Sequence, residues 1–202
     1  MTQRNVAILV FDDVEILDFA GPYEVFNVAR QTTTPPAFSV CNVGLAHRPV
    51  SGRGGFTVTP SYTIDDCPQP DILIVPGGYG TRPLLKHERL LAWLHAQSTK
   101  VEWLLSVCTG ALLLAQAGLL KNCRAVTHHT AFEELKEISP TTIIVEDERF
   151  VQASGRIMTS GGISAGIDLS LHMVEKLVDL ETRVAVVSEM EYNEVGSSWR
   201  RA

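Results

Sequence analysis

Cys108 stands in the segment Leu104–Gly110, which reads LLSVCTG and continues as the apolar stretch ALLLAQAGLL. This pattern predicts a buried strand, a sharp turn and a helix, the setting of a nucleophile elbow. The turn would hold the side chain at the carboxyl edge of a sheet, on a strained backbone and above a helix N-terminus. We therefore predict that Cys108 is exposed and reactive, with its pKa lowered toward the thiolate. Inert buried thiols are predicted at the other three cysteines, Cys41, Cys67 and Cys123.

Asp18 is the second candidate, an acidic residue among apolar neighbours in Ile16–Pro22 (ILDFAGP). One interpretation is a helix N-cap, a position that aspartate favours. The other is a buried carboxyl group beside Cys108. Burial would raise its pKa and allow it to act as a general acid. The spacing alone does not decide between the two.

Glycines and a histidine provide further candidates at strand ends. Gly77 and Gly78 end the strand predicted at Asp71–Val75, either as a simple turn or as a close backbone approach with an N–H aimed at a substrate oxygen. His128 follows another strand end and could be a base or a structural residue. The small residues of GGISAGID, from Gly161 to Asp168, let the backbone pass close to a pocket or to another helix.

The elements that position these residues alternate along the chain. Strands are expected at 5–11, 38–43, 71–75, 101–107, 125–127, 142–145, 150–153 and 157–159, with a hairpin at 48–58. Helices are expected from Gly21-Pro22 onward with Pro22 in the first turn, and at 84–97, after Gly110, at 131–138, from 162 to about 178 and at 181–189. This alternation implies an α/β fold, a mostly parallel sheet with helices on both faces. We expect one domain over residues 1–202, with about 190–202 a frayed tail.

Composition narrows the classes of partner. The 202 residues carry a net charge of -6 without clustered Lys and Arg, which argues against nucleic acid and anionic membrane as partners. No stretch is long and apolar enough to span a bilayer, and no secretory signal is seen, so a cytoplasmic location with reduced thiols is expected. No CxxC pair, Cys/His cluster or nucleotide-binding glycine motif occurs. We therefore expect no metal and no cofactor.

Taken together, these residues resemble the ThiJ/PfpI family of the class I glutamine amidotransferase-like superfamily. The resemblance rests on VAILVF, LDFAGPYEVF, DILIVPGG, SVCTGALLLAQAGLL, THH and TSGGISAGIDLSL, in this order over about residues 5–178. It implies a flavodoxin-like three-layer sandwich, an elbow cysteine at Cys108 and a partner acid at Asp18. A homodimer acting on a small-molecule substrate is also implied.

Within the family, Asp18, Cys108-Thr109 and the GGISAGID stretch are similar to the isonitrile hydratase subgroup, hydro-lyases that add water to an isonitrile carbon to give an N-substituted formamide. The resemblance implies that Cys108 attacks the terminal carbon to give a thioimidate, and that Asp18 donates and relays protons. Thr109 would position Asp18 or the water. The N–H groups of Gly78 and Thr109 would line an anion site, and Ile163 would pack near the sulfur.

Two other functions remain open. The same motifs resemble the sensor-like domain of AraC-type regulators, which would use Cys108 for redox or ligand sensing without turnover; we expect no helix-turn-helix within these 202 residues. A glyoxalase or deglycase activity on 2-oxoaldehydes is the third interpretation. The protease and glyoxalase branches typically have Cys-His at the elbow and Glu as the acid, whereas this chain has Cys108-Thr109 and Asp18. His128 stands where some members place a histidine near the thiol.

Overall fold

The central element is a seven-stranded sheet, seen in a computed structural model that describes residues 2–192. Its strand order is β10-β11-β7-β6-β1-β2-β5, and every neighbouring pair is parallel except β10 with β11. The strands are β1 (Arg4–Leu9), β2 (Phe38–Gly44), β5 (Tyr62–Thr63), β6 (Ile72–Val75), β7 (Trp103–Val107), β10 (Phe150–Ser154) and β11 (Ile157–Ser160). Short pairs outside this sheet are β3 (Val50–Ser51) with β4 (Thr57–Val58), and β8 (Arg124–Ala125) with β9 (Ile143–Ile144).

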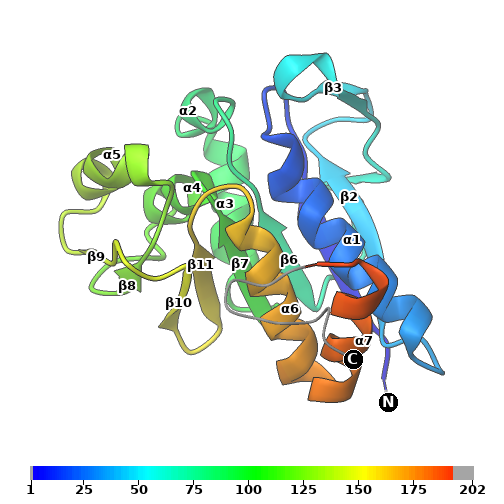
Figure 1. Cartoon of the computed structure of the whole chain (residues 1–202). Helices are drawn as coiled ribbons and strands as arrows, with labels where there is room; N and C mark the ends of the chain where they lie inside the picture. Colours follow the sequence, from blue (N-terminus) through cyan, green and yellow to red (C-terminus); the bar gives the residue numbers. More distant parts are fainter. Residues whose placement is uncertain (1, 193–202) are drawn as a thin grey trace.

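Helices cover both faces of the sheet, as the alternation of elements predicts, and the fold is the flavodoxin-like α/β sandwich that the resemblance implies (Figure 1). One layer contains α1 (Ile16–Thr32), α6 (Ala165–Leu177) and α7 (Leu180–Glu189), which pack on one another. The other contains α2 (Thr81–Leu84), α3 (Glu88–Gln97), α4 (Gly110–Gln116) and α5 (Phe132–Ile138). Two 3₁₀ turns, η1 (Arg53–Gly55) and η2 (His129–Ala131), lie in the connections.

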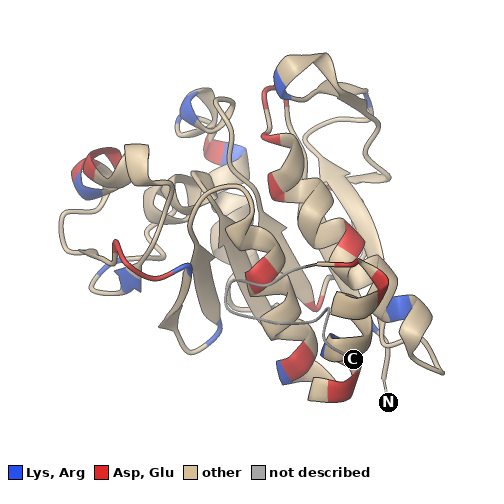
Figure 2. Cartoon of the chain, viewed as in Figure 1, with Lys and Arg blue, Asp and Glu red and all other residues tan. Residues whose placement is uncertain are grey.

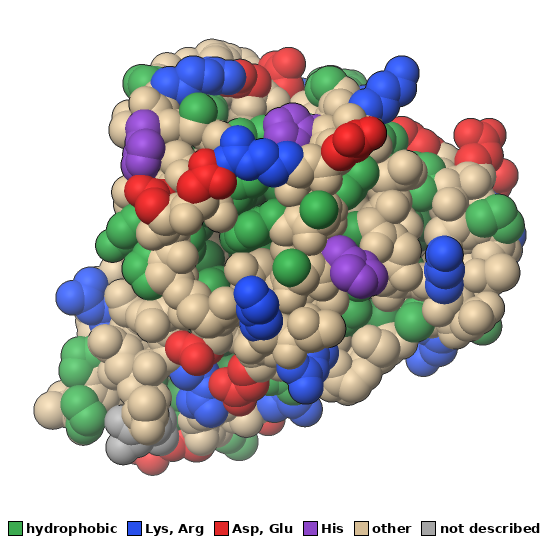
Figure 3. Space-filling model, turned by 180° about the vertical axis from the view of Figure 1, so that it is seen from behind, with side chains coloured by type: hydrophobic (Ala, Val, Ile, Leu, Met, Phe, Trp, Pro, Cys, Tyr) green, Lys and Arg blue, Asp and Glu red, His purple; other side chains and the backbone are tan. Residues whose placement is uncertain are grey.

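The middle of the sheet is formed by strands without charged residues. Every residue of β6 (ILIV) and β7 (WLLSV) is buried, as expected for parallel strands covered on both faces. Charged residues lie mainly on the helices and loops around them (Figure 2). Seen from behind, acidic, basic and histidine side chains are interspersed over the surface, with hydrophobic side chains between them (Figure 3). The buried strands therefore form a rigid base for the loops at their carboxyl ends.

Two expected helix boundaries are wrong. Pro22 is not in the first turn of its helix, because α1 begins at Ile16 and Pro22 is buried in its interior. Burial of Phe19, Val25 and Phe26 along α1 outweighs the one backbone hydrogen bond that a proline removes. The single helix expected over 84–97 is divided into α2 and α3, since the Nδ1 of His87 accepts the Leu90 N–H (3.1 Å) and caps the second helix.

Most of the tail expected over 190–202 lies outside the described residues. Within residues 2–192, no helix combines the length and the apolar character needed to cross a membrane.

Candidate active site

Cys108 lies directly between β7 and α4 on a left-handed backbone, with φ of 57°. Such a value is rare outside glycine, so the strained turn predicted from the sequence is confirmed. Hydrogen bonds hold the turn: the Cys108 N–H lies 3.1 Å from the carbonyl oxygens of both Ser160 and Gly161, and the Thr127 hydroxyl donates to the Cys108 carbonyl (2.8 Å). The backbone around Cys108 is thereby held by the end of β11 and by the segment after β8.

Gly110 allows the elbow to lie against the neighbouring strand. A Cβ at this position would lie 2.0 Å from the carbonyl oxygen of Val75 and 2.9 Å from that of Pro76. We expect Gly110→Ala to lower the free energy of unfolding by about 1–3 kcal/mol or more, since the clash is with backbone that cannot move aside. Gly155→Ala is the matched control because a Cβ there meets nothing within 4 Å. Urea unfolding of both variants measures the difference, and equal stabilities would contradict the close approach.

Asp18 lies in the first turn of α1 and is fully buried, while Glu15 occupies the N-cap position. Its Oδ2 accepts the Gly77 N–H at 3.0 Å. Its Oδ1 forms no hydrogen bond of standard geometry with the described part of the chain. The other hydrogen-bonding groups that act on the carboxyl are the Cys108 thiol and the backbone N–H of Ile163. Of the two interpretations of Asp18, the structure supports the buried carboxyl beside Cys108.

Burial raises the pKa of Asp18 to about 7, in agreement with the sequence-based expectation. The hydrogen bonds from the Gly77 N–H and the Cys108 thiol oppose this shift, and the nearby Glu15 carboxylate adds to it. A carboxyl group with a pKa near neutrality can both accept and donate a proton under ordinary conditions. Asp18 therefore has the protonation behaviour that a proton relay needs.

The expectation that Cys108 is exposed with a lowered pKa is wrong. Its side chain is only 6% exposed, and burial, followed by the negative charge of Asp18, raises the pKa of the thiol to about 12. The backbone N–H groups of Thr109 and Ile163 favour the thiolate but do not offset these two effects. The hydrogen bond between the pair raises the pKa of the thiol and lowers that of the acid, as expected for a thiol that donates to a carboxylate.

Ile163 joins the two groups through its backbone. Its φ is 52°, an unusual value for a β-branched residue, and its N–H acts on both the Asp18 carboxyl and the Cys108 sulfur. The loop between β11 and α6 thus supplies a donor to each member of the pair. The resemblance implies only that Ile163 packs near the sulfur, so this backbone contribution is new.

The Thr109 hydroxyl binds to the backbone and not to Asp18. Its Oγ1 accepts the Gly78 N–H at 3.0 Å and also lies 3.2 Å from the Gly78 carbonyl oxygen. The Gly77 N–H is bound to Asp18. Both of the glycine amides expected to face a substrate therefore already have partners within the protein. In this arrangement they position the acid and the elbow.

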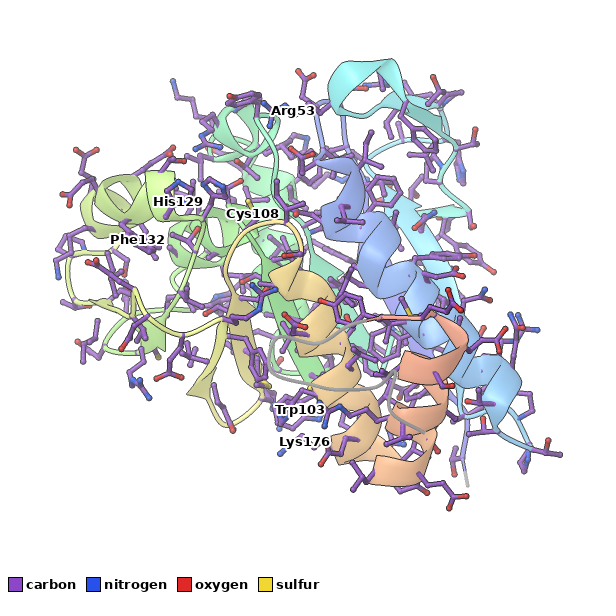
Figure 4. All side chains as sticks on the ribbon, in the orientation of Figure 1. Arg53, Trp103, Cys108, His129, Phe132 and Lys176 are labelled. Carbon is purple, nitrogen blue, oxygen red and sulfur yellow. The ribbon has the colours of Figure 1, made fainter. Side chains whose placement is uncertain are left out.

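A small cavity of about 80 Å³ opens above the sulfur. It is lined by Glu15, Arg53, Gly78, Tyr79, Arg82, Cys108, Thr109, His128, Thr130 and Ile163. Five of these ten, namely Glu15, Arg53, Tyr79, Arg82 and Thr130, were not singled out from the sequence. Arg53 pairs with Glu15 (2.8 Å) and stacks 4.6 Å above the Tyr79 ring, and Figure 4 shows it over the edge of the sheet that carries Cys108. The one feature of the sequence that could have marked Arg53 as a site residue is its position between glycines in GRGG.

His128 lines this cavity and is half-buried. Burial and the neighbouring His129 and Arg82 lower its pKa, so the imidazole is neutral at neutral pH. Its Nδ1 bonds to the Thr130 hydroxyl at 2.8 Å. The neighbouring His129 stacks on it and lies between Cys108 and α5 in Figure 4. His128 can therefore offer a neutral polar contact to a bound molecule.

A mostly parallel sheet with a cysteine on a strained elbow at its carboxyl edge, and an acid from the first helix beside it, defines an α/β class of nucleophile-elbow proteins. The sequence matches the DJ-1/PfpI family over residues 4–176, and the chain belongs to this family.

Relatives within and near this family differ in their described roles. The chain is 36% identical to the isonitrile hydratase of Pseudomonas putida over 188 residues, covering 93% of this chain and 78% of the relative. It is 27% identical to the HTH-type transcriptional regulator GbdR of Pseudomonas aeruginosa over 187 residues, which is 93% of this chain but 50% of the regulator. A crystal structure of a THiJ/PfpI family protein from Pseudomonas syringae superimposes with a TM-score of 0.85 at 27% identity, covering 96% and 77% of the two chains.

Proposed function

We propose that this protein is an isonitrile hydratase-like hydro-lyase that converts a small isonitrile and water to an N-substituted formamide. The observation that carries the proposal is the Cys108–Asp18 pair, in which a thiol is hydrogen-bonded to a buried acid whose pKa lies at about 7. The identity of 36% to an isonitrile hydratase supports this choice of reaction within the family.

The first half of the reaction joins sulfur to carbon. As the Cys108 sulfur attacks the terminal carbon of the isonitrile, the thiol proton passes to the ionised Asp18 carboxylate. Asp18 then delivers this proton to the same carbon, which completes a thioimidate with a C–H bond. Because the pKa of the free thiol is about 12, transfer to Asp18 replaces a preformed thiolate as the means of activation.

The second half adds water and releases the cysteine. Asp18 takes a proton from a water molecule as the water attacks the thioimidate carbon, and it delivers this proton to the nitrogen, which gives a tetrahedral intermediate with a hydroxyl group. As the C–S bond breaks, the hydroxyl proton passes through Asp18 to the Cys108 sulfur. The product is the N-substituted formamide, and Cys108 recovers its thiol. The N–H groups of Thr109 and Ile163, which act on the sulfur, would stabilise the negative charge on the departing thiolate.

The cavity suits a small reacting group. A volume of about 80 Å³ admits the linear isonitrile function, while the rest of the substrate would extend past Tyr79 and Arg53 toward solvent. Incubation of the protein with a panel of aliphatic and aromatic isonitriles, followed by NMR for the formamide C–H, tests the proposal. Enzyme-dependent formamide formation is the expected result. Turnover no faster than that of a Cys108→Ala sample across the panel would contradict it.

A ligand-sensing role without turnover is the second candidate, because 93% of this chain is similar to part of the transcriptional regulator GbdR. The form of this alternative that uses oxidation of Cys108 has less support, since peroxide attacks thiolates and this thiol is buried with a raised pKa. Saturable binding of an isonitrile or formamide, measured by calorimetry in the absence of turnover, would favour the ligand sensor. No observation in the structure specifically favours glyoxalase or deglycase chemistry.

A further inference from the structure

Cys41 lies on a part of the sheet that is remote from the elbow. Asn5 pairs with Ser39 and Ala7 pairs with Cys41 in the register of β1 and β2, so these four side chains share one face of the sheet. A cavity of about 250 Å³ lies against that face. It is lined by these four residues together with Val40, Ser61, Tyr62, Pro68 and Pro70. Cys41 therefore lines a cavity and is only partly buried.

The segment after β5 brings a second cysteine to the same place. Asp66 Oδ1 accepts the N–H (2.6 Å) and the hydroxyl (2.8 Å) of Thr63, and the Cys67 N–H donates to the Thr63 carbonyl (2.9 Å). These bonds form a tight turn that fixes the backbone of Cys67. The chain then continues through Pro68 to the start of β6. Cys67, also partly buried, directly precedes Pro68, which lines the cavity together with Cys41.

The two thiols interact directly and inequivalently. The Cys67 thiol donates to the Pro68 carbonyl (3.2 Å), and its contact with Cys41 lowers the pKa of Cys41, whereas this contact and burial raise the pKa of Cys67. Cys41 is therefore the more acidic of the two thiols. A partly exposed thiol of lowered pKa with a second thiol in contact has the arrangement of a reactive cysteine and its resolving cysteine. Neither residue stands out in the sequence, because they are separated along the chain and do not form a CxxC motif.

We propose that Cys41 and Cys67 form a redox-active dithiol that closes to an intramolecular disulfide when the protein meets a peroxide. The Cys41 thiolate attacks one oxygen of hydrogen peroxide, the O–O bond breaks, and Cys41 becomes a sulfenic acid with release of water after protonation. The Cys67 sulfur then attacks the Cys41 sulfur, losing its proton, and the sulfenic oxygen leaves as a second water. Two thiols are oxidised to one disulfide, and one peroxide is reduced to two waters.

This reactivity is distinct from that of Cys108. The thiol of Cys108 is 6% exposed and has its pKa raised to about 12, while Cys41 is partly exposed and has its pKa lowered. Peroxide should therefore oxidise the Cys41–Cys67 pair before it modifies the elbow cysteine. The disulfide would also tie the turn after β5 to β2 and so restrict the unfolded chain.

Peptide mapping under non-reducing conditions tests the proposal, since the positions of Lys and Arg place the four cysteines in four tryptic peptides. With cleavage before Pro49 and Pro83 excluded, these peptides are 31–53, 54–86, 101–121 and 122–124. The reduced protein is treated with hydrogen peroxide, quenched with acid and alkylated before digestion. We expect peptides 31–53 and 54–86 to appear as one linked species that has lost the mass of two hydrogen atoms, while peptide 101–121 remains alkylated.

Variants distinguish this pair from other oxidation. Cys67→Ser should abolish the linked species and leave Cys41 as a sulfenic acid that dimedone captures, whereas Cys123→Ser, the matched control, should leave the link intact. Cys41→Ala provides a second test if Cys67→Ser does not fold. The oxidised wild type should unfold at a higher temperature than the reduced protein, with the difference absent in both pair variants. A linked species joining any other two peptides, a link between two chains, or oxidation of Cys108 alone would overturn the proposal.

Discussion

Replacing Cys108 with alanine is expected to reduce formamide production from an isonitrile by roughly 10⁴-fold or more, to the level of the buffer, because the alternative of direct water attack has no activated nucleophile. Cys108→Ser is expected to be nearly as inactive. A hydroxyl is a far weaker nucleophile than a thiol, and Asp18 with a pKa of about 7 is too weak a base to ionise it. The measurement is the rate of formamide C–H appearance by NMR under substrate-saturating conditions.

The control for this prediction is Cys123→Ser, which changes a partly exposed thiol that is not among the residues lining the cavity. It should retain wild-type turnover. Melting curves for all three variants separate loss of chemistry from loss of fold, since Cys108 is buried and its replacement also affects packing. Residual activity within about tenfold of wild type in a folded Cys108→Ala variant would remove the covalent mechanism.

Replacing Asp18 with asparagine is expected to lower the activity and to raise the stability of the folded protein. Asparagine retains an oxygen for the Gly77 N–H but cannot accept the thiol proton, so kcat/KM should fall by roughly 10²- to 10⁴-fold. In the wild type, kcat/KM should rise as pH increases through about 7, where Asp18 ionises. This limb of the pH–rate profile should be absent from the variant. A profile with the same midpoint in both proteins would assign the ionisation to another group.

The stability effect follows from the same pKa. The unfolded chain releases the Asp18 proton near 3.8, whereas the folded protein retains it until about 7. Between pH 3.8 and about 7 the folded state binds more protons than the unfolded state, so the wild type loses stability as the pH rises through this range. The contribution of Asp18 to stability is fully present only below pH 3.8. Asp18→Asn should therefore gain up to about 4 kcal/mol relative to wild type between low and neutral pH. Asp147→Asn, on an exposed loop, is the control and should show no such gain.

The layers of strands and helices and the place of the Cys108 elbow can be predicted from the sequence because their signals are local. Buried strands such as DILIV and VEWLLSV are continuous apolar runs, and the Cys108 elbow follows one of them directly. The strand order and the two-residue strand β5 have no comparable signal, because they depend on pairing between distant segments. Pro22 shows the limit of local rules, since tertiary burial extends α1 across it.

Several residues of the candidate site can be predicted from the sequence, but their electrostatics cannot. The position of Cys108 directly before a helix predicts a lowered pKa for its thiol. However, the sulfur is desolvated and lies beside a carboxylate, and these two effects raise the pKa by more than the backbone N–H groups lower it. Likewise, the amides of Gly77 and Gly78 are identified, but not their existing bonds to Asp18 and Thr109. Arg53 and Arg82 reach the cavity from separate connections, and their approach requires the complete fold.

Asp18 and Cys108 belong to opposite layers of the sandwich, since the acid is carried by α1 on one face and the cysteine leads into α4 on the other. The Gly77 amide, at the end of β6, anchors the acid between them. A small sideways shift of one helical layer would move the Asp18 carboxyl away from the Cys108 sulfur while each layer stays folded. The proposed catalytic rate should therefore depend on the alignment of the two layers. During gentle heating, this rate should fall before any spectroscopic sign of unfolding.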